Sequence, residues 1–230
     1  MTLDALKAAV LDANLATVRY GLVKATFGNA SGIDRDSGLI AIKPSGVPYE
    51  DMTPDHMVIC DLEGRSRDNR FRPSSDLDTH LVLYRAFDGI GAVIHTHSTF
   101  ATIMAQAQRP IIPLGTTHAD YFHGEIPVTR NLTPEEIDTR YVAATGDVIV
   151  EAFEGRDPLE VPAVLVAGHG PFVWGDTIEH AVLNAMILEE VAKMAWHALT
   201  ISPSAPPISQ SLLDRHYRRK HGANATYGQN

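Results

Sequence analysis

Short β-prone runs lie in the middle of this sequence, and segments with helical spacing precede, separate and follow them. The β-prone runs cover residues 23–27, 39–43, 57–62, 92–97 and 161–167, with Gly, Pro and Asp between the first three. A chain that interleaves strands and helices in this way buries its apolar residues by packing helices on a sheet. We therefore expect one α/β or α+β layered domain. The order of the strands does not follow from this pattern.

Helices are expected where apolar residues recur at helical spacing after a capping residue. The expected helices cover residues 3–20, 75–87, 99–108, 134–153, 177–200 and 209–221. The run Thr133-Pro134-Glu135-Glu136 combines a capping box with proline at the first helical position. The stretch 202–207 (SPSAPP) reads as a break between two helices, so residues 1–230 are expected to form a single domain.

The charge and the cysteine content of the chain exclude some classes of partner and location. The sequence has 19 Lys and Arg against 28 Asp and Glu, a net charge of −9, so neither nucleic acid nor an anionic membrane is an expected partner. No apolar run reaches the ~18 residues of a membrane span. The start of the chain, 1–7, shows no secretory signal, and a single cysteine, Cys60, permits no intrachain disulfide. We expect a cytoplasmic protein.

Histidines in two motifs are candidate metal ligands. His95 and His97 are two residues apart on a predicted strand, which places both rings on one face about 7 Å apart. His169 follows another predicted strand, between two glycines, and Asp76 in the first turn of a predicted helix offers an oxygen. Such donors suit Zn²⁺, with Co²⁺ or Mn²⁺ as alternatives. A hydrogen-bonded structural histidine is the other interpretation of each position. His80, His118 and His123 are further candidates.

Three turns rich in Gly and Ser are candidate anion sites. They are Gly28-Asn29, Lys43-Pro44-Ser45-Gly46 and Arg72-Pro73-Ser74-Ser75. Such turns expose backbone N–H groups, the last one opens a predicted helix, and Lys43 adds a positive charge. None matches the GxxxxGK[ST] nucleotide loop. Taken singly, each is also compatible with an ordinary turn.

Acid–base candidates lie in the second half of the chain. Asp120, in the polar run GTTHADYF, is either a general base or a residue that caps a turn. From Ser209 onward the chain carries four Arg or Lys and one Asp, a basic end that would attract an anionic substrate. Tyr227 lies in the short tail that follows.

Taken together, these segments resemble the class II aldolase/epimerase family along nearly the whole chain. The resemblance runs through TFGNAS, IKPSGV, PSSDLDTHLVLY, VIHTHS, GTTHADYFHGEIPVTR, GHGPFVWG and LLDRHYRRKHGANATYGQ. It implies a single α/β domain with a central, mainly antiparallel sheet flanked by helices. It also implies a homotetramer with active sites between subunits. Asp76, where related aldolases often carry Glu, and the segment THADYF favour the sugar-phosphate 4-epimerase branch.

The resemblance also implies a role for each candidate residue. It assigns Asp76, His95, His97 and His169 to a metal, normally zinc. It places the substrate phosphate near Gly28, Asn29, Lys43, Ser45, Gly46, Ser74 and Ser75. It makes Asp120 and Tyr227 the proton-transferring pair, with His216 and Thr116 in support, and it sends residues 209–230 to a neighbouring subunit's site. Ala167-Gly168 and Thr226 depart from the epimerase pattern, in which polar residues and an aromatic residue usually stand there.

The activity that the resemblance implies is inversion at C4 of a ketopentose phosphate, from L-ribulose 5-phosphate to D-xylulose 5-phosphate. Such an enzyme serves pentose breakdown, for example of L-arabinose. The alternatives are a class II aldolase that releases a free aldehyde, a decarboxylase on the same fold, and a non-catalytic scaffold like the adducin head. A scaffold predicts lost metal ligands, whereas the chain keeps all four candidates.

Overall fold

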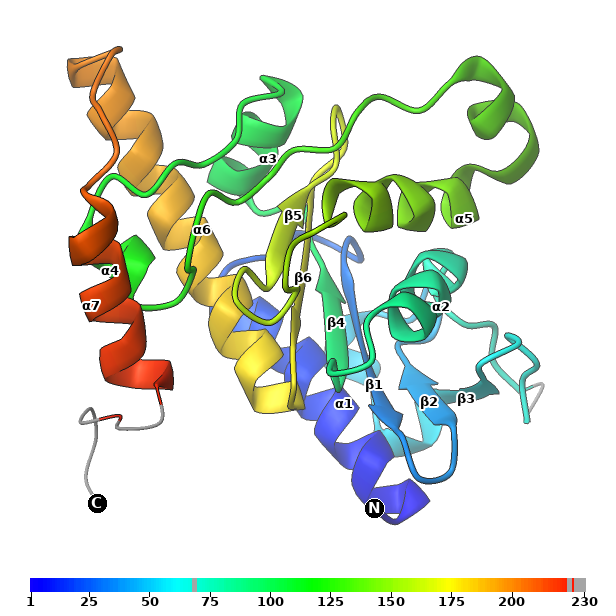
Figure 1. Ribbon diagram of the computed structural model, residues 1–230. Coiled ribbons are helices and arrows are strands. Elements are labelled where there is room, and N and C mark those ends of the chain that lie inside the picture. The colour runs from blue at the N-terminus through cyan, green and yellow to red at the C-terminus, as the bar shows by residue number, and fades with distance from the viewer. Residues whose placement is uncertain (68–69, 223–224, 226–230) are drawn as a thin grey trace.

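An antiparallel sheet organises the molecule (Figure 1). The computed structural model describes residues 1–67, 70–222 and 225. Within this part of the chain six strands pair in the order β3-β2-β1-β4-β6-β5, each antiparallel to its neighbours. Their bounds are β1 Asn29–Asp34, β2 Leu39–Ile42, β3 Val58–Asp61, β4 Ala92–His95, β5 Ala163–Leu165 and β6 Pro171–Gly175.

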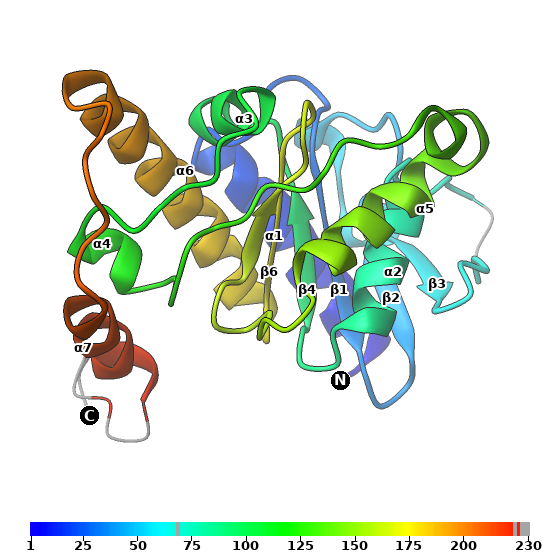
Figure 2. The same cartoon turned by 45° about the horizontal axis from the view of Figure 1, so that its top comes forward.

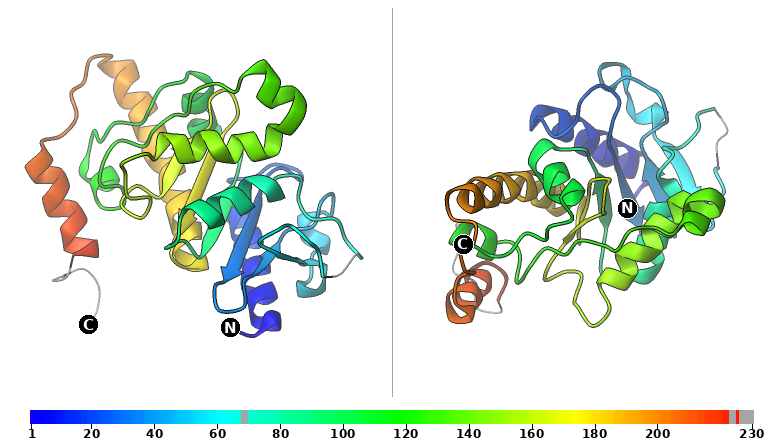
Figure 3. Two further views of the ribbon diagram at one scale, coloured as in Figure 1. Left: turned by 45° about the vertical axis from the view of Figure 1, so that its right-hand side comes forward. Right: turned by 90° about the horizontal axis from the view of Figure 1, so that it is seen from above.

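Helices cover both faces of this sheet (Figures 2 and 3). On one face lie α1 (Leu3–Arg19) and α6 (Ile178–Ile201), and on the other lie α2 (Leu77–Ala86) and α5 (Pro134–Ala152). α3 (Thr99–Gln106) packs on α6, while α4 (Thr116–Ala119) and α7 (Gln210–His221) pack together at the side of the molecule. Two 3₁₀ turns, Tyr49–Asp51 and Pro54–His56, precede β3. The predicted fold class, a single layered domain with an antiparallel sheet, is confirmed.

Capping explains why several predicted helices begin where they do. Thr133 accepts a hydrogen bond from the Glu136 backbone N–H at 3.2 Å, and the Glu136 carboxylate accepts one from the Thr133 N–H at 2.8 Å. This is the predicted capping box, which satisfies two N–H groups that the helix leaves open. Thr177 and Ser209 cap α6 and α7 with their hydroxyl groups alone, which accept hydrogen bonds from the His180 and Leu212 N–H groups. None of the described helices has the length and apolar character needed to cross a lipid bilayer.

The first strand was not predicted, and the strand predicted over 23–27 is wrong. Residues 25–26 form a turn, with Ala25 at φ 49°, and the strand β1 starts only at Asn29. Its sequence, NASGID, lacks apolar bulk because two helices approach it closely. A Cβ on Gly32 would lie 2.8 Å from Ile178 Cδ1 and 3.0 Å from Val10 Cγ2. Small residues are therefore what this central strand requires.

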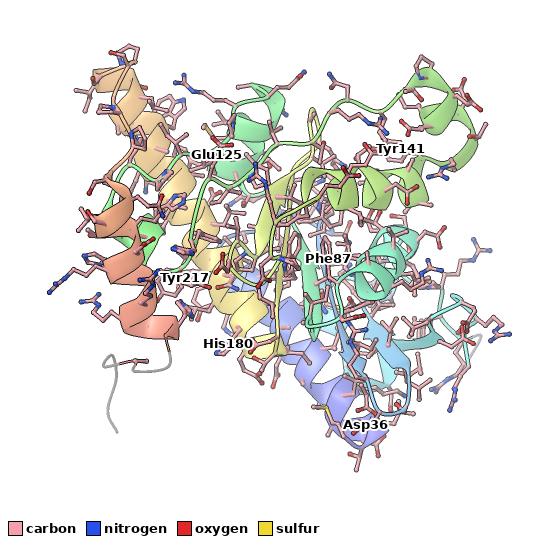
Figure 4. The ribbon with its side chains drawn as sticks, in the orientation of Figure 1. Asp36, Phe87, Glu125, Tyr141, His180 and Tyr217 are labelled. Atoms are coloured by element: carbon pink, nitrogen blue, oxygen red, sulfur yellow. The ribbon has the colours of Figure 1, made fainter. Side chains whose placement is uncertain are left out.

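Two further elements were also missed. The strand β6 begins with Pro171, which needs no ladder hydrogen bond at its own nitrogen, and ends with Gly175. Its centre is apolar, and Trp174 packs against Phe87 and Phe153 in the buried core, with ring centroids 5.2 and 5.0 Å away (Phe87 is labelled in Figure 4). The single-turn helix α4 lies in the polar run GTTHADYF, for which no helix was predicted.

Candidate active site

The topology of the sheet brings the predicted site residues to one end of it. Because neighbouring strands are antiparallel, the starts of β1 and β6 and the ends of β2 and β4 lie at the same end. Asn29 is directly opposite His95 in the ladder. A cavity of about 410 Å³ opens there, and its lining includes every residue that the family resemblance assigns to phosphate or metal. These are Gly28, Asn29, Lys43, Ser45, Gly46, Ser74, Ser75, Asp76, His95, His97 and His169.

Three imidazoles converge in this cavity. Each of His95, His97 and His169 offers one ring nitrogen, and the three nitrogens lie within 4.8 Å of one another. The Nδ1–H of His95 donates to the Pro171 carbonyl at 2.9 Å, which leaves its Nε2 as a free lone pair. That Nε2 lies 3.1 Å from Nε2 of His97. Converging imidazole nitrogens of this kind are the donor set that zinc and similar ions prefer.

The surroundings of His95 and His169 favour the neutral form of these two rings. Burial lowers the pKa of His95 well below its ordinary value, and Asp76 only partly offsets this effect. Burial and the neighbouring His97 also lower the pKa of His169. A neutral imidazole keeps the lone pair that a metal ion needs. The residues present therefore fit a divalent cation.

Two residues that sequence reasoning missed hold His97 in place. The Phe27 ring stacks on the His97 ring, with centroids 5.9 Å apart and an angle of 21° between the planes. Two residues after His97, α3 begins, and Glu189 on α6 accepts hydrogen bonds from its Phe100 and Ala101 N–H groups at 2.9 and 3.0 Å. This carboxylate caps α3 from another helix and fixes the chain that follows His97. A lone Glu within a long helix carries no sequence signal of this role.

Asp76 faces the histidines but is not part of the converging set. It precedes α2, and its Oδ2 accepts a hydrogen bond of 2.6 Å from the Asn29 side-chain amide. Its charge reaches the imidazoles, because it opposes the loss of a proton by both His95 and His169. Asp76 therefore lines the same cavity as the three histidines, with one carboxylate oxygen hydrogen-bonded to the first residue of β1.

Lys43 is the positive charge of the cavity. Its side chain is 3% exposed and lies over the Tyr49 ring, with Nζ 4.8 Å from the ring centroid. Burial lowers the pKa of Lys43, and the nearby Asp76 counteracts this. The Lys43 carbonyl accepts a hydrogen bond from the Ser74 N–H at 2.9 Å, which joins two of the three predicted turns. All three predicted turns contribute lining residues to the cavity, and together they form its wall of turns.

Gly28 shows why the first of these turns needs glycine. Its φ is 81°, and a Cβ there would lie 2.8 Å from Val23 Cγ1 and 2.9 Å from the His95 carbonyl oxygen. A larger residue would push the start of β1 away from β4. Asn14 on α1 fixes the same strand from the other side, since its side chain makes hydrogen bonds with both the N–H and the carbonyl of Ala30.

The other candidate histidines have different surroundings. His80 is a buried residue of α2, and its Nδ1 lies 2.7 Å from the Ser31 hydroxyl oxygen. Burial lowers the pKa of His80 to about 4. His118 donates from Nε2 to the Gly124 carbonyl at 2.6 Å. His123 bonds to the Asp214 carboxylate at 2.8 Å. In the described part of the chain, the one group of metal-competent donors is the cluster of His95, His97 and His169.

Two of the predicted acid–base residues, Asp120 and His216, meet at the junction of α4 and α7. Asp120 accepts hydrogen bonds from His216 Nδ1 at 3.0 Å and from the Arg219 guanidinium at 3.0 and 3.2 Å. Thr116 is the exposed first residue of α4. Of these residues, none lines the cavity that holds the histidines. Tyr227 and Thr226 lie outside the described residues.

Comparisons with known proteins agree with this geometry. The sequence model of the class II aldolase and adducin N-terminal domain matches residues 8–196. A protein of Salmonella paratyphi B (strain ATCC BAA-1250 / SPB7), named L-ribulose-5-phosphate 4-epimerase UlaF, is 53% identical over 224 residues, which cover 97% of this chain and 98% of the relative. The Salmonella typhi protein of the same name shows the same identity and coverage.

Solved structures share the fold. An L-fuculose 1-phosphate aldolase superposes with a TM-score of 0.80 at 26% identity, covering 94% of this chain and 95% of that one. YgbL from Escherichia coli, described as a putative aldolase/epimerase/decarboxylase, superposes with a TM-score of 0.74 at 23% identity, covering 93% of this chain and 98% of that one. The second likeness concerns the fold alone.

Proposed function

This chain belongs to the class II aldolase and adducin N-terminal domain family, and we propose that it is a metal-dependent L-ribulose-5-phosphate 4-epimerase. The observation that carries the proposal is the convergence of three imidazoles in one cavity with Lys43 and the Gly- and Ser-rich turns. Near full-length relatives that are 53% identical and bear this name support it.

The substrate phosphate is assigned to the wall of turns. Lys43 supplies a full positive charge, and the segment Ser74-Ser75 precedes the N-terminus of α2, where N–H groups attract an anion. Seven residues contribute to this subsite: Gly28, Asn29, Lys43, Ser45, Gly46, Ser74 and Ser75. With the phosphate bound there, the sugar chain extends toward the histidines across the same cavity.

The reaction needs cleavage of a carbon–carbon bond. The hydrogen on C4 is not acidic because the carbonyl is at C2, so direct proton abstraction does not invert this centre. A base instead removes the C4 hydroxyl proton, the C3–C4 bond breaks, and its electron pair moves toward the C2 carbonyl. The fragments are the enediolate of dihydroxyacetone and glycolaldehyde phosphate. The aldehyde rotates and rejoins through its other face, and the alkoxide takes a proton, so atoms and charge balance.

The residues that would hold the metal ion are His95, His97 and His169, with Asp76 beside them. A bound divalent cation acts as a Lewis acid toward the substrate oxygens that become negative during cleavage. The chain itself prepares the site by favouring the neutral form of His95 and His169 and by orienting His95 through the Pro171 carbonyl. We propose zinc as the bound ion. Mn²⁺ and Co²⁺ are the alternatives for the same set of donors.

Two proton-transfer groups are needed on opposite faces of the aldehyde, and we assign them to Asp120 and Tyr227. His216 and Arg219 hold the Asp120 carboxylate in place, and Thr116 lies four residues before it. Because the Asp120 cluster is outside the metal cavity of its own chain, we propose that it completes the cavity of a neighbouring subunit. A ring of four subunits repeats such a head-to-tail contact and closes it.

The cell context follows from the chemistry of the substrate. We propose a cytoplasmic enzyme of pentose breakdown, for example of L-arabinose, because sugar phosphates are intracellular metabolites. The single cysteine, Cys60, is buried and free, in accord with a reducing compartment.

An aldolase that releases its aldehyde is the second candidate, because the L-fuculose 1-phosphate aldolase shares this fold at 26% identity. An NMR time course of zinc-loaded protein with L-ribulose 5-phosphate separates the two. We expect D-xylulose 5-phosphate to appear without accumulated glycolaldehyde phosphate, and a sample treated with EDTA to be inactive. Accumulated fragments would make the protein an aldolase. No turnover by folded, metal-loaded protein would rule out this substrate.

A further inference from the structure

The His169 ring is held by a different kind of partner from the His95 ring, which bonds to the backbone carbonyl of Pro171. It lies on the loop between β5 and β6, where Gly168 adopts a φ of 70° and a Cβ on Gly170 would lie 2.9 Å from the Thr96 carbonyl oxygen. The flanking residues Ala167, Gly168 and Gly170 have no polar side chain. The loop therefore fixes the backbone of His169 and leaves its ring without a partner from its own neighbours.

Tyr141 on α5 supplies that partner. Its hydroxyl oxygen lies 3.5 Å from Nδ1 of His169, at the long limit of a hydrogen bond, and the two rings are 6.3 Å apart between centroids. Among the described residues, this is the one hydrogen bond that the His169 ring makes. Figure 4 labels Tyr141 near the bend of α5, 28 residues before the histidine in the sequence.

Contacts between α5 and α2 fix the backbone around Tyr141. α5 bends at Arg140, whose φ of −155° and ψ of 36° are not helical, so Tyr141 opens the second part of the helix. In the next residue, the Val142 carbonyl accepts a hydrogen bond of 2.6 Å from the Thr79 hydroxyl on α2. A Cβ on Gly146 would lie 2.6 Å from Val82 Cβ, so the two helices touch closely. Tyr141 is thus attached to the helix that Asp76 precedes.

We propose that Tyr141 is a positioning residue for His169, which rests on the proposed metal-dependent function. Its phenolic oxygen accepts the Nδ1–H of His169 and so keeps the lone pair on Nε2, turned toward His95 and His97. Pro171 does the same for His95 through its carbonyl. Outer partners of metal-binding histidines select the tautomer and orient the ring, and their loss typically weakens metal affinity about 10–100-fold.

The test compares the wild-type protein with Tyr141→Phe, which removes only the hydroxyl oxygen. Tyr20→Phe, at an exposed tyrosine on the end of α1, is the matched control. Zinc affinity is measured by competition with a chromogenic chelator. We expect Tyr141→Phe to bind zinc about 10–100-fold more weakly and Tyr20→Phe to match the wild type.

Proton NMR of the zinc-loaded protein gives a second readout that a merely structural role would not move. The Nδ1–H signals of His95 and His169 are both expected in the wild type. In Tyr141→Phe the His169 signal should be lost through fast exchange with water, while the His95 signal persists because Pro171 protects it.

Two outcomes would overturn the inference in different ways. Unchanged zinc affinity together with an unchanged His169 signal in Tyr141→Phe would remove Tyr141 from the site and leave the proposed function intact. A wild-type protein that takes up no zinc would overturn the metal site itself, and the role of Tyr141 with it.

Discussion

The side-chain amide of Asn29 donates a hydrogen bond of 2.6 Å to the carboxylate of Asp76, across 47 residues of sequence. This bond joins the first residue of β1 to the residue that precedes α2. It orients the carboxylate toward the histidines, and it keeps Asn29 in the wall assigned to the phosphate. A single contact therefore links the two proposed halves of the cavity, for metal and for phosphate.

Replacement of Asn29 should weaken substrate binding more than turnover. We expect Asn29→Leu to raise KM for L-ribulose 5-phosphate about tenfold or more, because the wall loses a polar group and Asp76 loses its partner. Asn131→Leu, at an exposed asparagine away from the cavity, is the control. Steady-state kinetics measure the effect, and an unchanged KM would contradict the assignment of the phosphate wall.

Replacement of His97 should remove metal and activity together. In His97→Asn we expect bound zinc, measured by atomic emission after gel filtration, to fall well below one ion per chain, and activity to fall in proportion. His197→Asn, at an exposed histidine of α6, should keep both. Full zinc content in His97→Asn would show that this ring is not a ligand.

Mixing two inactive variants tests whether the active sites lie between subunits. His97→Asn lacks a metal-binding ring and Asp120→Asn lacks the proposed base, so neither is expected to turn over substrate alone. In randomly mixed rings, a site combines an intact metal cavity with an intact neighbouring Asp120 in about a quarter of cases. Refolding a 1:1 mixture should therefore restore about a quarter of wild-type activity. No recovery, although the mixed tetramers form, would place both groups within one chain.

The buried side chain of His118 makes the free energy of unfolding depend on pH. Burial lowers the pKa of His118 from 6.5 to about 4, with the hydrogen bond to Gly124 acting in the opposite direction. The unfolded chain therefore binds more protons than the folded chain between these values. The contribution of His118 to stability is complete above pH 6.5 and is lost as the pH falls from 6.5 toward 4. Its size is on the order of 3 kcal/mol.

Urea unfolding at pH 7 and pH 4.5, in EDTA, measures this dependence. The free energy of unfolding of His118→Gln should fall less over this interval than that of the wild type, whereas His197→Gln should follow the wild type. Equal pH dependence in all three proteins would mean that His118 titrates normally in the folded state.

Much of the architecture was predictable because local signals agree with it. The capping box at Thr133, the β-branched run before His95 and the glycine after α7 each mark an element that the structure contains. The strand β1 escaped prediction because its small residues are dictated by Val10 and Ile178, which lie far away in the sequence. No local pattern carries that information.

The candidate site shows the same difference between what local sequence signals predict and what depends on distant residues. The eleven residues predicted to bind phosphate or metal all line one cavity, and their spacing and their resemblance to a family pointed to them. The residues that support them, Phe27, Tyr141 and Glu189, were not found. Each acts on a residue that lies elsewhere in the chain, as Tyr141 does on His169. Their separation in the sequence hides these contacts until the chain is folded.

The position of β6 between β4 and β5 has a consequence for synthesis on the ribosome. β4 ends at His95, but its partner β6 ends only at Gly175, about 80 residues later. At typical rates of translation this interval lasts roughly 4 to 16 seconds. During that time His95 has neither the Pro171 carbonyl nor the Phe172 ring that later hold it, and His169 has not been made. A nascent chain thus exposes an incomplete set of imidazoles, and the three rings of the candidate metal site come together only after β6 is inserted.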